Sequence, residues 1–360
     1  MTRCISVQRI FQATLWLGMV LLLCQCQGGM RSLRRAQSDA EFIVTETFLT
    51  ERRRADNVDS PAVWHGPGGR HWLITTAKSA HQLLVHDAAN GELIRRVGGP
   101  GTEAGRFGRP NGIIVIGDFV VVVERDNHRL QALSLPDFEP VALLGAEVLR
   151  EPYGIATVRG EGGWDVWVTD NYEPNSASAP ASEMGERLRR FRLQASDVQL
   201  TGEYVGAFGD TTEASYLRKV ESIAIDPVHG RMLVADEAEG VHKVYDLEGR
   251  FTGQLVGKGV FKNKPEGLAL LECAEGRGYW LATDQDYANN RFLVFDRENL
   301  AIRGNFSGAV IVNTDGVALT RLNFGPFSRG AFYAVHDDGN VAAFDLAKIV
   351  ADLGLDCGSR

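Results

Sequence analysis

A repeat of short apolar strands constrains this chain more than any other feature of its sequence. Six times a strand-like run begins just after a polar residue, and in four of the six that residue is an acid. The openings are Asp59-Ser60-Pro61-Ala62-Val63, Asn111-Gly112-Ile113, Tyr153-Gly154-Ile155, Glu221-Ser222-Ile223, Glu266-Gly267-Leu268 and Asp315-Gly316-Val317. Their small residues are 62, 112, 154, 222, 267 and 316, so the spacing is 50, 42, 68, 45 and 49 residues. A repeat of this length built of strands is typical of a β-propeller.

Each unit continues with a strongly apolar second strand. These strands are expected at residues 72–75, 120–123, 164–167, 232–235, 279–282 and 332–335. Runs of β-branched and aromatic residues that are bounded by Gly, Asp and Asn favour strands over helices. No long helical period lies between Ala62 and Asp345. We therefore predict an all-β fold, a six-bladed β-propeller of four-stranded antiparallel blades. A two-sheet sandwich is the alternative, but a sandwich rarely needs so many strands.

The two ends of the repeat predict how the ring closes. The sixth unit ends at Asp345 without a clear fourth strand, whereas residues 41–48 form a strand-like segment ahead of the first unit. We expect this N-terminal strand to complete the sixth blade and close the ring, since a closed ring leaves no exposed sheet edge. Residues 346–355 are expected to form a short amphipathic helix on the outside.

The first residues of the chain have the composition of a targeting segment. Arg3 and Arg9 precede an apolar run, residues 10–23, which is short for a membrane span but suits a secretory signal. Cys24 and Cys26 follow, and this segment resembles a bacterial lipoprotein signal. We expect a signal peptide at 1–26, with Cys24 or Cys26 as the lipid attachment point, a flexible tether at 27–40, and a single domain at 41–360. The expected location is the periplasm, the outer membrane or the medium of a bacterium.

Composition narrows the range of partners. With 360 residues, of which 44% are hydrophobic, the chain can bury a full core, and its net charge of −8 argues against nucleic acid as the main partner. We expect a monomer whose only membrane attachment is the N-terminal lipid. Outside the signal only Cys273 and Cys357 remain. Either they form a disulfide that fastens the C-terminal tail to the fifth unit, or they are free thiols.

The polar residues at the strand openings indicate a metal site. Equivalent positions of a propeller meet around its centre, so oxygen donors from five units would gather there: Asp59, Asn111, Glu221, Glu266 and Asp315. Glu237 and Glu239 add two carboxylates after a second strand. Ca²⁺ takes six to eight oxygen ligands, and clustered acids repel one another unless cations neutralise them. Two alternatives stay open: the acids are solvated turn formers, or they form a buried polar network that binds only water.

Several motifs resemble those of one known family, the β-propeller phytases. Residues 56–64 (DNVDSPAVW) resemble the family's Asp-x-Asp-Asp-Pro-Ala-Ile-Trp opening. Further matches follow in the same order: 73–78 (LITTAK), 109–111 (RPN), 124–125 (ER), 151–154 (EPYG), Glu221, 236–239 (DEAE), 265–268 (PEGL) and 314–317 (TDGV). The resemblance extends over about residues 56–355.

This resemblance implies a calcium-dependent phosphoric monoester hydrolase, similar to a 3-phytase. Its substrate would be phytate (myo-inositol hexakisphosphate) or a related phosphorylated small molecule, attacked by a water that Ca²⁺ activates. On the matching positions, the calcium ligands would be Asp59, Glu221, Glu237, Glu266 and Asp315, with Glu221, Glu266, Asp315 and Tyr153 at the reaction centre. Phosphate would be bound by Lys78, Arg125 and Tyr153. The chain departs from the family at Ser60 and Lys264, where the family has acids.

Two other functions are compatible with the same sequence. Residues 105–113 and 124–131 resemble a single NHL repeat, and a calcium-dependent lactonase or esterase propeller would share the ring of acids. A non-catalytic propeller that binds a partner at the cell envelope is the third hypothesis. It is supported by the Ser/Pro/Ala-rich insertion at residues 170–186, because long polar loops often carry binding sites.

Overall fold

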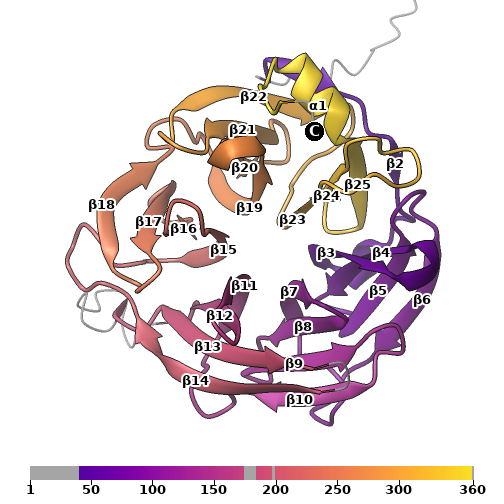
Figure 1. Cartoon of the computed structure of the whole chain (residues 1–360), viewed down its shortest axis with the longest axis vertical. Coiled ribbons are helices and arrows are strands. Elements are labelled where there is room, and N and C mark those ends of the chain that lie inside the picture. Colours follow the sequence, from indigo (N-terminus) through magenta and orange to yellow (C-terminus); the bar gives the residue numbers. More distant parts are fainter. Residues whose placement is uncertain (1–39, 174–183, 197–198, 359–360) are drawn as a thin grey trace, which may run out of the picture. The chain divides into compact units, whose positions relative to one another are not determined.

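The structure is a computed structural model that describes residues 40–173, 184–196 and 199–358. These residues belong to one compact unit, in which six sheets are arranged as blades around a ring (Figure 1). The predicted all-β, six-bladed β-propeller is confirmed. The predicted signal peptide, its lipid-bearing cysteine and almost all of the tether lie outside the described residues, as do residues 174–183 of the predicted insertion. Within the described ranges, no helix combines the length and the apolar character that a membrane span requires.

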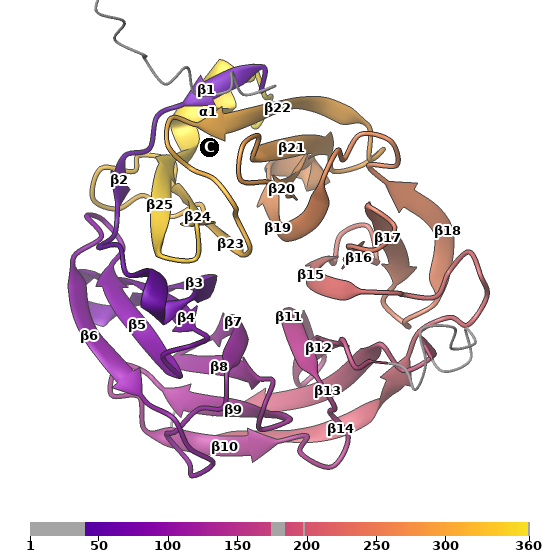
Figure 2. The same cartoon turned by 180° about the vertical axis from the view of Figure 1, so that it is seen from behind.

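Each blade consists of antiparallel strands that follow one another from the centre of the ring outward (Figures 1 and 2). Blades 1 to 3 contain β3 (Val58–Gly66), β4 (Arg70–Ala77), β5 (Gln82–Asp87), β6 (Leu93–Gly98); β7 (Pro110–Ile116), β8 (Phe119–Glu124), β9 (Arg129–Ser134), β10 (Pro140–Leu144); β11 (Pro152–Gly160), β12 (Gly163–Asp170), β13 (Leu188–Ala195), β14 (Leu200–Phe208). Blades 4 to 6 contain β15 (Val220–Asp226), β16 (Arg231–Asp236), β17 (Val241–Asp246), β18 (Phe251–Val256); β19 (Lys264–Glu272), β20 (Gly278–Gln285), β21 (Arg291–Asp296), β22 (Ile302–Gly308); β23 (Val317–Thr320), β24 (Ala331–His336), β25 (Asn340–Asp345).

The N-terminal segment closes the ring as two short strands. β2 (Phe48–Leu49) pairs with β25 and supplies the fourth strand of blade 6, which confirms the predicted closure. The prediction of one continuous strand over residues 41–48 is wrong, because β1 (Phe42–Val44) pairs in parallel with β22 on the outside of blade 5 (Figure 2). Between the two strands, the Glu46 carboxylate accepts hydrogen bonds from the amides of residues 309–311, at 2.9–3.0 Å. This contact holds the segment where it passes from one blade to the next.

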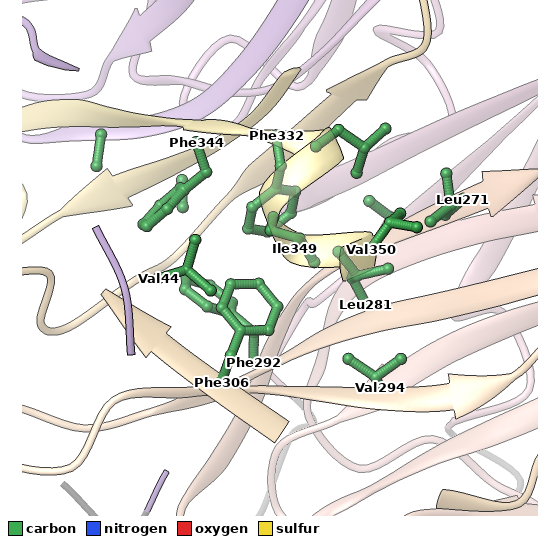
Figure 3. Packing of buried hydrophobic residues seen from close by; sticks show 14 of the residues in the cluster. Val44, Leu271, Leu281, Phe292, Val294, Phe306, Phe332, Phe344, Ile349 and Val350 are labelled. Carbon is green, nitrogen blue, oxygen red and sulfur yellow. The ribbon is translucent and has the colours of Figure 1, made fainter. Parts of the chain in front are cut away.

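Apolar side chains fill the space between neighbouring blades. The largest cluster lies between blades 5 and 6 and includes Phe292, whose ring centroid is 5.0 Å from those of Phe306 and Phe332 (Figure 3). Ile349 of α1 (Leu346–Asp352) is buried in the same cluster, so this helix is confirmed as the outer cover of the blades. The Asp345 carboxylate caps α1 by accepting a hydrogen bond from the Ala347 amide at 3.0 Å. A disulfide between Cys273 and Cys357 joins the tail to blade 5, the first of the two alternatives for these cysteines.

Four buried acids hold the blades to their connections. They lie at the ends of the second strands of blades 2 to 5, as the last residue or, in blade 5, the last but one. They are fully buried and are called anchor acids here: Glu124, Asp170, Asp236 and Asp284. Each pairs with a cation at or near the start of the next strand: Arg129, Arg189, Lys243 and Arg291. Each also accepts a backbone hydrogen bond from the segment that enters its own blade, as Asp170 does from the Glu151 amide at 2.7 Å. Each anchor acid therefore fixes the entry of an innermost strand.

Candidate metal centre

A β-bulge, which recurs at one position of the innermost strands, places a polar side chain at the centre of the ring. In blades 1 to 5 the innermost strand contains a β-bulge, in which two residues face one residue of the second strand. The bulged pairs are Asp59-Ser60, Asn111-Gly112, Tyr153-Gly154, Glu221-Ser222 and Glu266-Gly267, and Asp315-Gly316 precedes β23 at the corresponding point of blade 6. A bulge re-aims its side chain, which explains why the first residue of each pair is polar. This register aligns Ser60 with the other small residues, so counting the repeat from Ala62 is wrong by two positions.

Small residues at the bulges allow neighbouring innermost strands to approach closely. A Cβ atom on Gly154 or Gly316 would lie 2.4 Å from the carbonyl oxygen of Glu221 or Asp59, respectively. The Gly316 amide instead donates a hydrogen bond to the Asp59 carbonyl at 2.9 Å. The side chains that precede the small residues are thereby drawn together from separate blades.

Two threonines of the second strands fix the bulges to the next blade. The Thr169 hydroxyl accepts a hydrogen bond from the Gly154 amide and donates one to the Glu221 carbonyl, both at 2.7 Å. Thr76 does the same in blade 1, accepting from the Ser60 amide at 3.0 Å and donating to the Asn111 carbonyl at 2.6 Å. These contacts position Asn111 and Glu221 through their backbones.

On one side of the centre, two aspartates share a buried lysine. The Lys78 Nζ lies 2.6 Å from Oδ1 of Asp59 and 3.5 Å from Oδ2 of Asp315. Burial alone would lower the pKa of Lys78, but the two carboxylates outweigh it and raise this pKa. The Tyr153 hydroxyl reaches across from blade 3 and donates a hydrogen bond to Oδ1 of Asp59 at 3.2 Å. Lys78 is therefore charged, and Tyr153 belongs to the same cluster.

On the other side, three glutamates converge. One carboxylate oxygen from each of Glu221, Glu237 and Glu266 lies within 4.8 Å of the other two. Burial raises the pKa of Glu221 to about 8, with Glu237 and Asp59 adding to the effect and Lys219 opposing it. Burial and the neighbouring acids raise the pKa of Glu266 well above its usual range. Burial by itself would raise the pKa of Glu237 too, but hydrogen bonds from Lys219 and Lys264 outweigh this effect and lower it. Glu221 and Glu266 are therefore the two glutamates of this group that have too little positive charge around them.

Asp315 connects the two sides. Burial, together with the charges of Asp59 and Asp338, raises its pKa to about 7 although Lys78 acts in the opposite direction. The Gln285 amide donates a hydrogen bond to Oδ1 of Asp315. The charge of Asp315 also contributes to the raised pKa of Glu266, so the five acids form one electrostatic unit, called the ring-centre acids here: Asp59, Glu221, Glu237, Glu266 and Asp315.

Two buried polar groups at the centre lack a hydrogen-bond partner among the described residues. They are the whole side-chain amide of Asn111, which is fully buried, and Oε2 of Glu221, a residue that is 4% exposed; the Thr283 hydroxyl, opposite the bulge of blade 5, is in the same state. Asn111 occupies blade 2, between the blades that Tyr153 and Asp59 connect. A buried polar atom without a partner costs about 1–3 kcal/mol. Oxygen donors in this state fit a hard cation such as Ca²⁺.

Most of the predicted site residues meet at this place. The structure brings together the ring-centre acids with Lys78 and Tyr153, and Asn111 lies at the equivalent bulge of its blade. Arg125 instead pairs with its neighbour Asp126 at 2.7 Å, and its predicted role in phosphate binding stays a prediction. Glu239 pairs with Lys243 and Arg218 beside an anchor acid rather than with the ring-centre acids.

Two further residues contact the ring-centre acids and were not among the predicted site residues: Gln285 and Lys219. Gln285 directly follows the anchor acid Asp284, as Glu237 follows Asp236, so alignment of the second strands could have identified it. Lys219 stands two residues before Glu221 and contacts the carboxylate of Glu237. No repeat predicts this contact, because it depends on the path of a single connection.

A cavity of about 430 Å³ lies beside the acids and can admit a small molecule. It is lined by Asn57, Lys78, Asn263, Lys264, Gln285, Asp286, Tyr287, Asn313, Asp315 and Asp338. A second cavity, of about 410 Å³, lies at the disulfide and α1, and its lining includes Leu271, Val350 and Cys357 but none of the ring-centre acids.

No family is identified for this chain by comparison with known proteins. No protein-family model and no curated protein matches the chain. Similar solved structures include a nidogen/laminin complex (15% identity, 74% of this chain and 87% of the other, TM-score 0.49) and a streptogramin B lyase (12%, 82% and 97%, 0.46). A third is the hydrazine synthase of Kuenenia stuttgartiensis (13%, 84% and 81%, 0.48). The class that the chain's own structure defines is a six-bladed β-propeller with an acidic centre, and the resemblance to phytases stays a prediction.

Proposed function

We propose that this protein is a calcium-dependent hydrolase of phosphomonoesters, phytate among them, and that its reaction centre lies among the ring-centre acids. One observation carries the proposal: the oxygens of Glu221, Glu237 and Glu266 lie within 4.8 Å of one another, and burial raises the pKa of Glu221 to about 8. Glu221 and Glu266, whose pKa values are both raised, need additional positive charge, and a divalent cation with oxygen ligands would supply it.

The residues of the centre divide into two roles. Glu221, Glu237 and Glu266 would hold calcium, with Asp59, Asn111 and Asp315 as further oxygen donors. When bound, Ca²⁺ would offset the charge of a phosphoryl group and lower the pKa of a bound water. Lys78, whose ammonium lies 2.6 Å from Asp59, would donate hydrogen bonds to a phosphate oxygen.

Tyr153 would act as a hydrogen-bond donor rather than as a base. Burial, and then the charges of the surrounding acids, raise its pKa well above the ordinary value. The phenol therefore stays protonated at neutral pH and can orient Asp59 or a substrate oxygen.

The cavity beside the acids supports a polar, hydroxylated substrate. Lys78 and Asp315 line it on the side of the metal centre, while Asn57, Asn313 and Gln285 contribute side-chain amides that can pair with hydroxyl groups. The phytase-like motifs support the same assignment, because their matched residues Asp59, Glu221, Glu266 and Asp315 are those that the bulge register brings to the centre.

The test is phosphate release from phytate and from p-nitrophenyl phosphate, with Ca²⁺ and after chelation. We expect activity only with Ca²⁺, and we expect Asp315→Asn to lower kcat/KM at least tenfold, a loss of about 1.4 kcal/mol of transition-state stabilisation. Asp296→Asn is the matched control, because Asp296 pairs with Arg303 on the outer part of blade 5. Phosphatase activity that ignores the chelator would reject the calcium mechanism. Lactone opening without phosphate release would favour a lactonase, and neither activity would favour a binding protein.

A further inference from the structure

Two lysines hold one of the acids of the candidate metal centre. The Lys264 Nζ lies 2.6 Å from Oε1 of Glu237, and the Lys219 Nζ contacts Oε2 of the same carboxylate. Lys219 also lies 3.9 Å from Oε1 of Glu221. The side chain of Glu237 is 8% exposed, whereas those of Lys219 and Lys264 are 46% and 55% exposed. Both ammonium groups thus approach a nearly buried carboxylate from the solvent side.

These contacts compete with a cation for the same oxygens. Calcium binds carboxylate oxygens at 2.3–2.6 Å, which is the distance range that a lysine nitrogen occupies here. A divalent ion between Glu221, Glu237 and Glu266 would also repel the two ammonium groups. A cation bound to the three glutamates would therefore weaken the ion pairs of Glu237 with Lys219 and Lys264.

Apart from the clustering of the acids, buried polar atoms without hydrogen-bond partners also indicate a ligand at the centre. Oε2 of Glu221 and the amide of Asn111 are buried and have no hydrogen-bond partner among the described residues. Neither lysine contacts these atoms in the structure. The lysines therefore satisfy Glu237 and leave part of the centre for a cation.

Of the two lysines, Lys264 already lies at the neighbouring cavity. Lys264 lines that cavity together with Lys78, and both lysines in contact with Glu237 are substantially exposed and attached by flexible stems. A phosphate or another anion in the cavity would find more positive charge after the cation has bound than before.

We propose that Lys219 and Lys264 form a displaceable clamp on Glu237, which cation binding opens and whose freed ammonium groups then bind an anionic substrate in the adjoining cavity. The proposal rests on the proposed function, because it assigns a cation to the glutamates. It requires positive coupling: the cation strengthens anion binding, and the anion strengthens cation binding by the same factor.

The experiment measures Ca²⁺ affinity by calorimetry, with and without sulfate as the anion probe, at constant ionic strength. For the wild type we expect sulfate to lower the Kd for Ca²⁺ by roughly fivefold or more, within the usual range of coupling between sites. For the double variant Lys219→Gln/Lys264→Gln we expect Ca²⁺ to bind at least as tightly without sulfate, and the effect of sulfate to fall below about twofold. Lys258→Gln is the matched control: it removes an exposed charge between β18 and β19, and its coupling should equal that of the wild type.

The outcomes separate the clamp from the proposed function. If Ca²⁺ binds but sulfate does not change its Kd in the wild type, or if the double variant keeps the full effect of sulfate, the clamp is wrong and the calcium site stands. If Ca²⁺ binds to none of the proteins, the proposed function is wrong and the clamp with it. A purely structural role of the lysines would lower the stability of the double variant without removing the coupling, which thermal unfolding of the same samples would detect.

Discussion

The two ends of strand β15 carry buried acids with opposite electrostatics. Glu221, at the centre of the ring, has a pKa raised to about 8 by burial and by neighbouring acids. Asp226, at the far end of the same strand, is fully buried, yet its pKa is lowered. Burial by itself would raise the pKa of Asp226 too. Hydrogen bonds from Arg297 at 2.7 and 3.1 Å and from His229 at 2.8 Å outweigh this effect.

The difference shows that burial alone does not mark a functional acid in this fold. Asp226 and the anchor acids each have a cation of their own, and such pairs hold strands and connections in place. The ring-centre acids share Lys78, Lys219 and Lys264 among five carboxylates. An excess of buried negative charge is what indicates an external cation.

The largest expected effect is a loss of folding stability when the cation that pairs with Asp226 is removed. Arg297→Met leaves Asp226 buried without its guanidinium, and breaking a buried pair from one side costs about 3–5 kcal/mol. Because His229 stays beside Asp226, we expect the lower end of this range, measured by urea unfolding. Arg303→Met is the control, because its pair with Asp296 is exposed to solvent and should contribute much less to stability. An equal loss in both variants would contradict the assignment of Asp226 to the structural pairs.

At the other end of β15, replacing the acid Glu221 should increase the stability of the fold instead of lowering it. Glu221→Gln removes a carboxylate that is desolvated and repelled, so we expect the calcium-free protein to gain about 1–2 kcal/mol at pH 8. Saturating Ca²⁺ should raise the Tm of the wild type by more than that of the variant, because only the wild type keeps the full set of oxygen ligands. A calcium-free variant that is less stable than the wild type would show that Glu221 is satisfied within the protein.

The smallest expected effect is a pH dependence of the calcium-free protein. The folded pKa of Glu221 is about 8 and that of Asp315 about 7, both above their unfolded values, so the folded state binds more protons in between. Stability should therefore fall as the pH rises from about 5 to 8. Asp226 adds nothing in this window, because its lowered pKa makes its stabilising effect disappear only in acid. Thermal unfolding across this range should show a shallower slope for Glu221→Gln, and an unchanged slope would argue against the raised pKa.

The repeat of strands predicted the architecture well because each strand is specified by nearby residues, and the same local pattern recurs in every blade. The six second strands, the closure through the N-terminus and the outer helix all followed from it. The division of residues 41–48 into two strands did not, because it depends on Glu46 meeting the loop of residues 309–311. The position of Ser60 in the repeat was also missed, since a bulge is defined by the partner strand.

The candidate site was predictable where residues occupy the bulge and not where they reach it from connections. Asp59, Glu221, Glu266 and Asp315 stand at one phase of the repeat. Lys219 approaches from a connection, and Gln285 from the end of a second strand, so their contacts depend on how neighbouring blades are placed. Arg125 matches a motif, but its guanidinium pairs with Asp126, and a motif does not specify a side-chain direction.

The amino-acid sequence by itself determined the number of blades, the strand order and the phase at which acids recur, because alternating apolar residues and small residues act over short distances along the chain. Only the tertiary structure decided which acids are neutralised. A carboxylate's charge balance depends on cations that lie far away in sequence, and burial magnifies that balance. The same strand could therefore carry one acid that stabilises the fold and another whose charge is not balanced within the protein, for which we propose an external cation.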